Sequence, residues 1–262
     1  MTPPMARLDP GSSDPEGTIR SYALYYQSGS YDRRYPAPNP RVLAHARRLA
    51  GPRTHLIDFG CGSGRYLLAL KDGVRLAAGF DPSAAGLDLL RARAAAQGGA
   101  PVQVLGPDPG DLARHVARHG PADLMLCLFG VLGHILPRAA RLQTLARMRA
   151  ALAPGGRLLL SVPNRRRRFA REQRHAGAEG AIHYRRQIAG AELCLPYQLF
   201  DPESLTAELA AAGFAVARLR AESVLPEAWL LAGRAPRLLD AALTPPCPAC
   251  WGYGLLAEAV PA

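Results

Sequence analysis

The stretch His55-Leu-Ile-Asp-Phe-Gly-Cys-Gly-Ser-Gly-Arg65 decides the fold of this chain. An apolar run ends in an acidic residue, three glycines follow at alternate positions, and a helix-forming segment comes next. Glycine is used where the backbone adopts a positive φ or approaches a ligand closely. A strand, a glycine turn and a helix N-terminus together build a nucleotide-type site at the carboxyl edge of a parallel sheet. The spacing is G-x-G-x-G, which differs from the G-x-G-x-x-G of dinucleotide-binding folds.

The rest of the chain alternates apolar runs with helical patterns, which predicts a parallel α/β sheet. The apolar runs are nearly continuous, as expected when helices cover both faces. Strands are expected at 54–59, 75–80, 101–105, 122–128, 156–162, 214–223 and 253–260. Helices are expected at 18–26, 41–49, 63–71, 83–97, 109–118, 138–152 and 202–212. The pattern therefore predicts a doubly wound, Rossmann-like α/β fold.

The 262 residues suffice for one sizeable α/β domain. Residues 1–17 are rich in Pro, Gly, Ser and Asp and lack the charged and apolar regions of a signal peptide, so we expect a disordered leader. Residues 18–262 then form a single domain, with a helical cap at 18–50. Prolines predict an irregular linker over 28–40. No run of about 18 apolar residues occurs, so no membrane span is expected and the cytoplasm is the expected location.

The segment 164–200 departs from the strand–helix alternation. Two short alternating runs, 182–187 and 192–197, flank Ala189-Gly190. This pattern predicts a β-hairpin inserted after the fifth strand. We expect this insertion to lie on the substrate side of the sheet.

Net charge is +11, which raises the possibility of a nucleic-acid partner. Nearly all of the positive charge is arginine, since Lys71 is the only lysine, and this bias is equally typical of a GC-rich genome. One cluster stands out, the run Arg165-Arg-Arg-Arg168. It fits a solvated or partly functional face better than a flap that grips a phosphate, a carboxylate or an RNA backbone near the active site, because no aromatic residues are interleaved with it.

The five cysteines are an odd number in a chain without an export signal, so a disulfide framework is not expected. Cys247-Pro-Ala-Cys250 is an isolated C-x-x-C pair. A structural zinc site needs four ligands, and no second Cys/His pair stands nearby. No metal is expected.

A second acidic residue, Asp81, ends the expected second strand. A carboxylate at this strand end can accept two hydrogen bonds from ribose hydroxyls. It could instead cap the following helix, but Ser83 can serve as that cap. The ribose role is therefore favoured.

The chain resembles the class I S-adenosylmethionine (SAM)-dependent methyltransferases, with a type 11/12-like domain, over roughly residues 50–223. The resemblance lies in Asp58 to Gly64, Asp81, Asp123 to Leu128, Leu152-Ala-Pro-Gly-Gly156 and Ala212-Gly-Phe214. It implies a seven-stranded sheet whose last strand is antiparallel and lies between the fifth and sixth. It also implies SAM bound across the glycine turn.

The resemblance implies roles for individual residues. Asp58 would lie near the methionine amino group of SAM, although the same carboxylate can tie down the glycine turn. An acidic residue after the third strand would accept from the adenine amino group, with Asp108 as the candidate and Asp111 as the alternative. The cofactor-binding set is therefore Asp58, Gly60, Cys61, Gly62, Gly64, Asp81, Asp108 and Phe129.

The loop after the fourth strand, Phe129-Gly-Val-Leu-Gly-His134, lies where the transferred methyl group is expected. It lacks the Asn/Asp-Pro-Pro-Tyr/Phe element of amino-directed methyltransferases that act on DNA bases or glutamine. His134 is the candidate general base, since imidazole titrates near neutral pH. The alternative, that His134 packs at the loop base or contacts the cofactor, stays open.

Candidate acceptor-binding residues are Asn164, Arg168, Tyr184 and Arg185. The expected function is in-line transfer of the SAM methyl group to an acceptor, most simply a small molecule. Tyr31-Asp-Arg-Arg-Tyr35 and the basic run are similar to bacterial relatives of tRNA wobble-uridine methyltransferases, so tRNA is the alternative acceptor. A non-catalytic SAM-binding scaffold is a further alternative. A nucleotide-dependent oxidoreductase is disfavoured by the glycine spacing.

Overall fold

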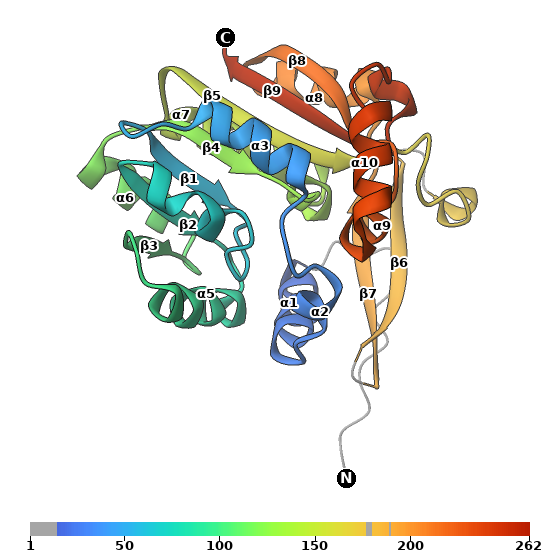
Figure 1. The fold of residues 1–262 in the computed structure, drawn as a ribbon, viewed down its shortest axis with the longest axis horizontal. Coiled ribbons are helices and arrows are strands. Elements are labelled where there is room, and N and C mark those ends of the chain that lie inside the picture. The colour runs from blue at the N-terminus through green and yellow to red at the C-terminus, as the bar shows by residue number, and fades with distance from the viewer. Residues whose placement is uncertain (1–14, 177–179, 189) are drawn as a thin grey trace.

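The computed structural model describes residues 15–176, 180–188 and 190–262. Its centre is a seven-stranded sheet in the order β3-β2-β1-β4-β5-β9-β8 (Figure 1). The strands are β1 (His55–Phe59), β2 (Leu76–Phe80), β3 (Val102–Leu105), β4 (Ala122–Cys127), β5 (Leu152–Pro163), β8 (Phe214–Ser223) and β9 (Gly254–Pro261). The first five are parallel, and β9 is antiparallel to both β5 and β8. The predicted fold class, including an antiparallel last strand placed between the fifth and sixth, is confirmed.

Helices cover both faces of the sheet because successive strand residues point to opposite sides. Leu56 packs with residues of the helices α3 (Pro40–Leu49), α4 (Leu67–Leu70) and α5 (Ala84–Gln97). Its neighbour Ile57 packs with residues of α6 (Asp111–His119), α7 (Arg138–Ala151) and α8 (Pro202–Ala211). The strands are buried on both sides, which explains their continuous apolar runs.

The predicted hairpin is present as β6 (Ala181–Ile188) and β7 (Ala191–Gln198), which form a separate two-stranded sheet. The first helix, α1 (Pro15–Gln27), contacts β7 and also α5 (Figure 1). The hairpin and α1 therefore lie together beside the sheet. Among the described residues, no helix has the length and apolarity required to cross a bilayer.

Several local expectations need correction. A short helix, α2 (Ser30–Arg34), occupies part of the linker predicted to be irregular, because the prolines all lie beyond it. The helix expected at 63–71 is reduced to α4, because the glycine turn continues to Tyr66. Of the predicted leader, residues 1–14 lie outside the described part of the chain, and residues 15–17 already belong to α1.

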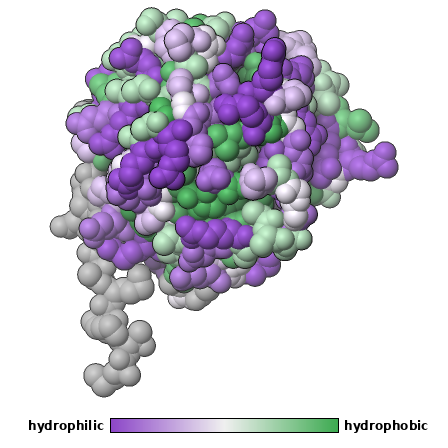
Figure 2. Space-filling view, turned by 90° about the vertical axis from the view of Figure 1, so that its left-hand side faces the viewer, coloured by the Kyte–Doolittle hydropathy of each residue, from purple (hydrophilic) through white to green (hydrophobic). Residues whose placement is uncertain are grey.

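Two helices that the sequence pattern did not single out, α9 (Glu227–Ala232) and α10 (Arg234–Leu243), follow β8. The carboxylate of Asp240 accepts hydrogen bonds from the backbone N–H groups of Val224 and Leu225, at 2.7 and 3.0 Å. Asp240 is 1% exposed, so this buried contact fixes α10 to the end of β8. Apolar surface is also visible at the centre of one face of the molecule, ringed by hydrophilic residues (Figure 2).

Candidate functional site

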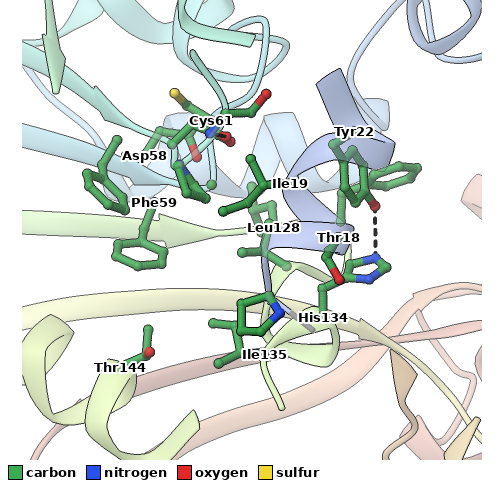
Figure 3. A pocket seen from close by; sticks show the side chains of 18 of the residues that line it. Thr18, Ile19, Tyr22, Asp58, Phe59, Cys61, Leu128, His134, Ile135 and Thr144 are labelled. Atoms are coloured by element: carbon green, nitrogen blue, oxygen red, sulfur yellow. Dashed lines mark hydrogen bonds between the residues drawn. The ribbon is translucent and has the colours of Figure 1, made fainter. Parts of the chain in front are cut away.

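A cavity of about 380 Å³ opens at the carboxyl edge of the parallel strands. Its walls come from the ends of β1 and β2, the loop after β4, and α1, as Figure 3 shows. Of the predicted site residues, Asp58, Gly60, Cys61, Asp81, Phe129 and His134 line it. Thr18, Ile19 and Tyr22 of α1 also line this cavity and were missed by the sequence reasoning, which treated α1 only as a cap.

The glycine turn follows β1 with φ values of 78°, 51° and 85° at Gly60, Gly62 and Gly64. These left-handed angles suit residues without a Cβ. The N–H groups of Gly60 and Cys61 both donate to the carbonyl of Phe80, at 2.7 and 3.1 Å. The turn is thereby fixed to the end of β2.

The Asp81 carboxylate closes the other side of the turn. It accepts hydrogen bonds from the N–H groups of Gly62 and Ser83, both at 2.8 Å. Burial raises its pKa to about 6, against the effect of these hydrogen bonds. Ser83 itself provides the side-chain cap of α5, accepting from the Gly86 N–H at 3.4 Å. Asp81 therefore holds the glycine turn and also faces the cavity.

Asp58 is a second buried carboxyl group on the same cavity, 3% exposed. Burial, and then the nearby charge of Asp81, raise the pKa of Asp58 to about 7. Two buried carboxyl groups in the same wall are not easily ionised together, and a cationic group placed between them would stabilise their ionised forms. The arrangement thus suits a positively charged ligand.

Phe129 shapes the wall after β4. Its φ of 63° is unusual for a residue with a side chain, and its N–H donates to Ser161 Oγ at 2.8 Å. The Arg65 guanidinium lies 4.1 Å from the centre of the Phe129 ring. Strained backbone of this kind is concentrated at functional sites, where the surroundings hold it in place.

Both ring nitrogens of His134 make hydrogen bonds, and Figure 3 shows the one to Tyr22. Nδ1 lies 3.2 Å from the carbonyl oxygen of Pro196, which only accepts, so Nδ1 carries the proton. Nε2 then accepts from the hydroxyl of Tyr22, at 2.8 Å. Burial lowers the pKa of His134 to about 4, so the ring is neutral at pH 7.

The predicted cofactor residues Gly62, Gly64 and Asp108 do not line this cavity, and neither does the candidate acceptor residue Asn164. Asp108 accepts from the Gly110 N–H and pairs with Arg114 at the surface, although the adjacent Pro109 does line the cavity. Gly64 packs against leucine side chains. The buried Asn164 amide donates to the carbonyl oxygens of Ala249, Cys250 and Gly252.

A second, smaller cavity of about 110 Å³ adjoins the first. The two share four lining residues, namely Tyr22, Tyr31, Phe129 and His134. Of the predicted acceptor residues, Arg168 and Tyr184 line the second cavity. Arg185 instead lies on the exposed face of β6, where it pairs with Glu192 of β7. Its neighbour Arg186 lines the second cavity.

The arginine run does not converge on one ligand site. Arg165 pairs with Asp201 at 3.7 Å and Arg166 with Glu203 at 2.8 Å. Arg167 donates to the Trp251 carbonyl at 2.7 Å. Only Arg168 turns inward, with its guanidinium 4.7 Å from the centre of the Tyr253 ring.

Comparisons with known proteins agree with the resemblance to methyltransferases. A family model described as a methyltransferase domain matches residues 31–219. The fold is similar to a SAM-dependent methyltransferase from Methanosarcina mazei, with 17% identity, a TM-score of 0.63, and 85% of this chain and 97% of that chain covered. It is also similar to DhpI, solved in a complex with SAM and HEP, at 17% identity and a TM-score of 0.61, covering 94% and 98%.

A third similar structure is the magnesium protoporphyrin IX methyltransferase of Synechocystis with bound SAH (S-adenosylhomocysteine). It has 17% identity, a TM-score of 0.60, and coverage of 95% of this chain and 100% of that chain. At such identities the likeness is one of fold. No curated protein matches the chain in sequence.

Proposed function

The chain belongs to the family of methyltransferase domains, and on that premise we propose that its methyl acceptor is a small molecule held in the second cavity. The protein is a SAM-dependent methyltransferase. One observation carries the proposal: a small cavity adjoins the larger one and shares a wall of four side chains with it. Two adjoining cavities suit a cofactor and an acceptor that must meet at one point.

The larger cavity suits SAM. Asp58 would hold the cationic amino group of SAM, and Asp81 would hold its ribose hydroxyls. Gly60 and Cys61 would contact the part of SAM that lies between these two groups. The raised pKa values of both acids support this, because burial disfavours their ionised forms and a cationic ligand would restore them. SAM supplies a sulfonium that makes its methyl group electrophilic.

The residues shared by both cavities would position the acceptor. A lone pair of the acceptor forms the new bond to the methyl carbon as the carbon–sulfur bond breaks, and the sulfur loses its positive charge. Phe129, Tyr31 and Tyr22 would exclude water from this line of attack. Where the acceptor is a hydroxyl, its proton would pass to the Tyr22 oxygen as Tyr22 gives its own proton to His134 Nε2, the nitrogen to which it already donates. Because His134 is a weak base, alignment would contribute more than proton removal.

A small-molecule acceptor is favoured over tRNA by the arginine run. Three of its four members are engaged with neighbouring protein groups, and the fourth lines the second cavity. An RNA groove needs accessible charge along a path. The Synechocystis relative is named for a small-molecule acceptor, which agrees with this proposal.

Replacing Asp81 with alanine is expected to weaken SAM binding by roughly 10- to 100-fold, because two hydrogen bonds to the glycine turn and the ribose contacts are lost together. Calorimetric titration with SAM measures the effect, with NAD as a second ligand that should not bind. Asp88→Ala is the matched control, since Asp88 is an exposed residue of α5 paired with Arg91. Equal SAM affinity in the two variants, or failure of the folded wild-type protein to bind SAM, would refute the assignment.

SAM binding should also depend on pH with a definite sign. The pKa values of Asp58, about 7, and Asp81, about 6, mean that both carboxyls are partly protonated below pH 7. A cationic ligand favours the ionised forms, so binding should release protons and weaken as the pH falls from about 7 to 5.5. Titrations in two buffers of different ionisation enthalpy count the protons released, and Asp58→Asn should reduce that number. Tighter binding at pH 5.5 than at pH 8 would contradict these roles for the two acids.

The same shifts bear on stability without ligand. A carboxyl whose pKa is raised on folding binds more protons in the native state than in the unfolded chain. The free energy of unfolding should therefore fall as the pH rises from about 4 to about 7 for this pair, and level off above that. Binding of SAM should offset this fall in the free energy of unfolding.

A further inference from the structure

The second cavity carries an excess of positive charge. Arg34, Arg168 and Arg186 line it from three separate segments of the chain. Within the part of the chain that the structure describes, none of the three has a carboxylate oxygen within 4.0 Å.

Arg186 is the clearest case. It is partly buried, and its contacts are tyrosines: Nη1 donates to Tyr25 Oη at 3.4 Å, and the guanidinium lies 5.4 Å from the centre of the Tyr184 ring. Burial raises the pKa of both phenols, so these partners are neutral. A partly desolvated guanidinium with neutral partners favours an anion from outside the protein.

Arg34 adds to the same end of the cavity. It donates to Tyr35 Oη at 2.9 Å and is exposed, which places it at the rim. The charges of Arg34 and Arg186 both lower the pKa of Tyr25, so the two guanidinium groups act on one region. An anion there would meet two cations.

The two acids of the cavity do not cancel this charge. Glu227 forms an ion pair with Arg65, at 2.9 Å. Burial, and then the neighbouring Glu227, raise the pKa of Glu222 to about 7, so this group is only partly ionised at neutral pH. Arg168 faces this acidic end, and its charge also lowers the pKa of both glutamates. The Arg186 end therefore stays positive.

The lining residues divide the second cavity into a part next to the SAM cavity and a part that carries the positive charge. The side chains shared with the SAM cavity, Phe129 and His134 among them, lie at the junction, whereas Arg34 and Arg186 line only the second cavity. We propose that the second cavity binds an acceptor that carries an oxyanion, a carboxylate or a phosphate, held by Arg186 with Arg34 at the rim, while its nucleophile faces the junction. This inference rests on the proposed function and deepens it.

The test uses the protein saturated with SAH, titrated calorimetrically with four ring compounds: benzoate, phenyl phosphate, benzamide and benzylamine. The two anions should bind at least tenfold more tightly than the neutral and cationic probes, and the stronger of the two identifies the anion type. Arg186→Gln should weaken anion binding at least tenfold and leave benzamide unaffected. Arg185→Gln, one residue along the same strand and on its opposite face, should change anion binding less than twofold.

The outcomes separate this inference from the proposed function. If SAH does not bind, the cofactor assignment fails and the acceptor question falls with it. If SAH binds but benzamide or benzylamine binds as tightly as both anions, the anionic acceptor is refuted. The same holds if Arg186→Gln, shown to be folded by its SAH affinity, binds both anions as the wild-type protein does. Arg34→Gln provides a second variant, with a smaller expected loss of about two- to fivefold because Arg34 is exposed.

Discussion

Replacing Gly62 with valine should lower SAM affinity at least about 100-fold, the largest functional effect we expect from a single substitution. Gly62 has a φ of 51°, which costs an L-residue roughly 1–2 kcal/mol. A Cβ at this position would also collide with the hydroxyl of Tyr26. Either the Tyr26 side chain or the turn must move, and a shift of the turn takes the Gly62 N–H away from the Asp81 carboxylate that accepts from it.

Calorimetric titration with SAM measures the loss, and thermal unfolding shows whether the variant is folded. Gly73→Val is the control, because Gly73 is exposed, has no left-handed φ, and offers space in which a Cβ would meet no heavy atom within 4 Å. It should retain SAM affinity. A folded Gly62→Val protein with unchanged affinity would mean that SAM does not approach this turn.

Replacing Arg141 with methionine should lower the free energy of unfolding by about 3–5 kcal/mol, the largest stability effect we expect. Arg141 is 3% exposed, and its Nε donates to Glu208 Oε1 at 2.6 Å. Its Nη1 donates to the carbonyl of Ile135, which follows His134 in the wall of the SAM cavity. The substitution leaves Glu208, 5% exposed, without its buried partner.

Urea unfolding at pH 7 measures this effect. Arg138 bonds the same glutamate at 3.1 Å from a half-exposed position, so Arg138→Met should cost less than about 1 kcal/mol. The double variant Arg141→Met with Glu208→Leu should recover much of the loss, since no buried charge is left unpaired. Equal stabilities of Arg141→Met and Arg138→Met would show that the buried ion pair contributes little.

The sheet could be predicted from the sequence because its signals are local. Buried parallel strands are continuous apolar runs, and the glycine spacing after β1 marks the turn that faces the cavity. Asp81 lines the cavity because it follows the carboxyl end of a parallel strand, an edge that the strand pattern alone locates.

The acceptor side could not be predicted in the same way. The choice between Arg185 and Arg186 depends on which face of β6 is turned inward, and a shift of one residue reverses it. The contact between Tyr22 and His134 joins residues far apart in the sequence and depends on where α1 docks. The Asp108 side chain pairs with Arg114, a surface contact of the following helix that the motif pattern does not encode.

Helix α1 supplies Tyr22 to the walls of both cavities, and Tyr22 is tied to His134 in the loop between them. Whatever orders or displaces this helix therefore changes both binding sites at once. A cofactor that holds α1 in place also completes part of the surface that the acceptor requires, so the two ligands should bind with positive cooperativity. Thermodynamic linkage makes that coupling reciprocal: the acceptor should tighten the binding of the cofactor by the same factor.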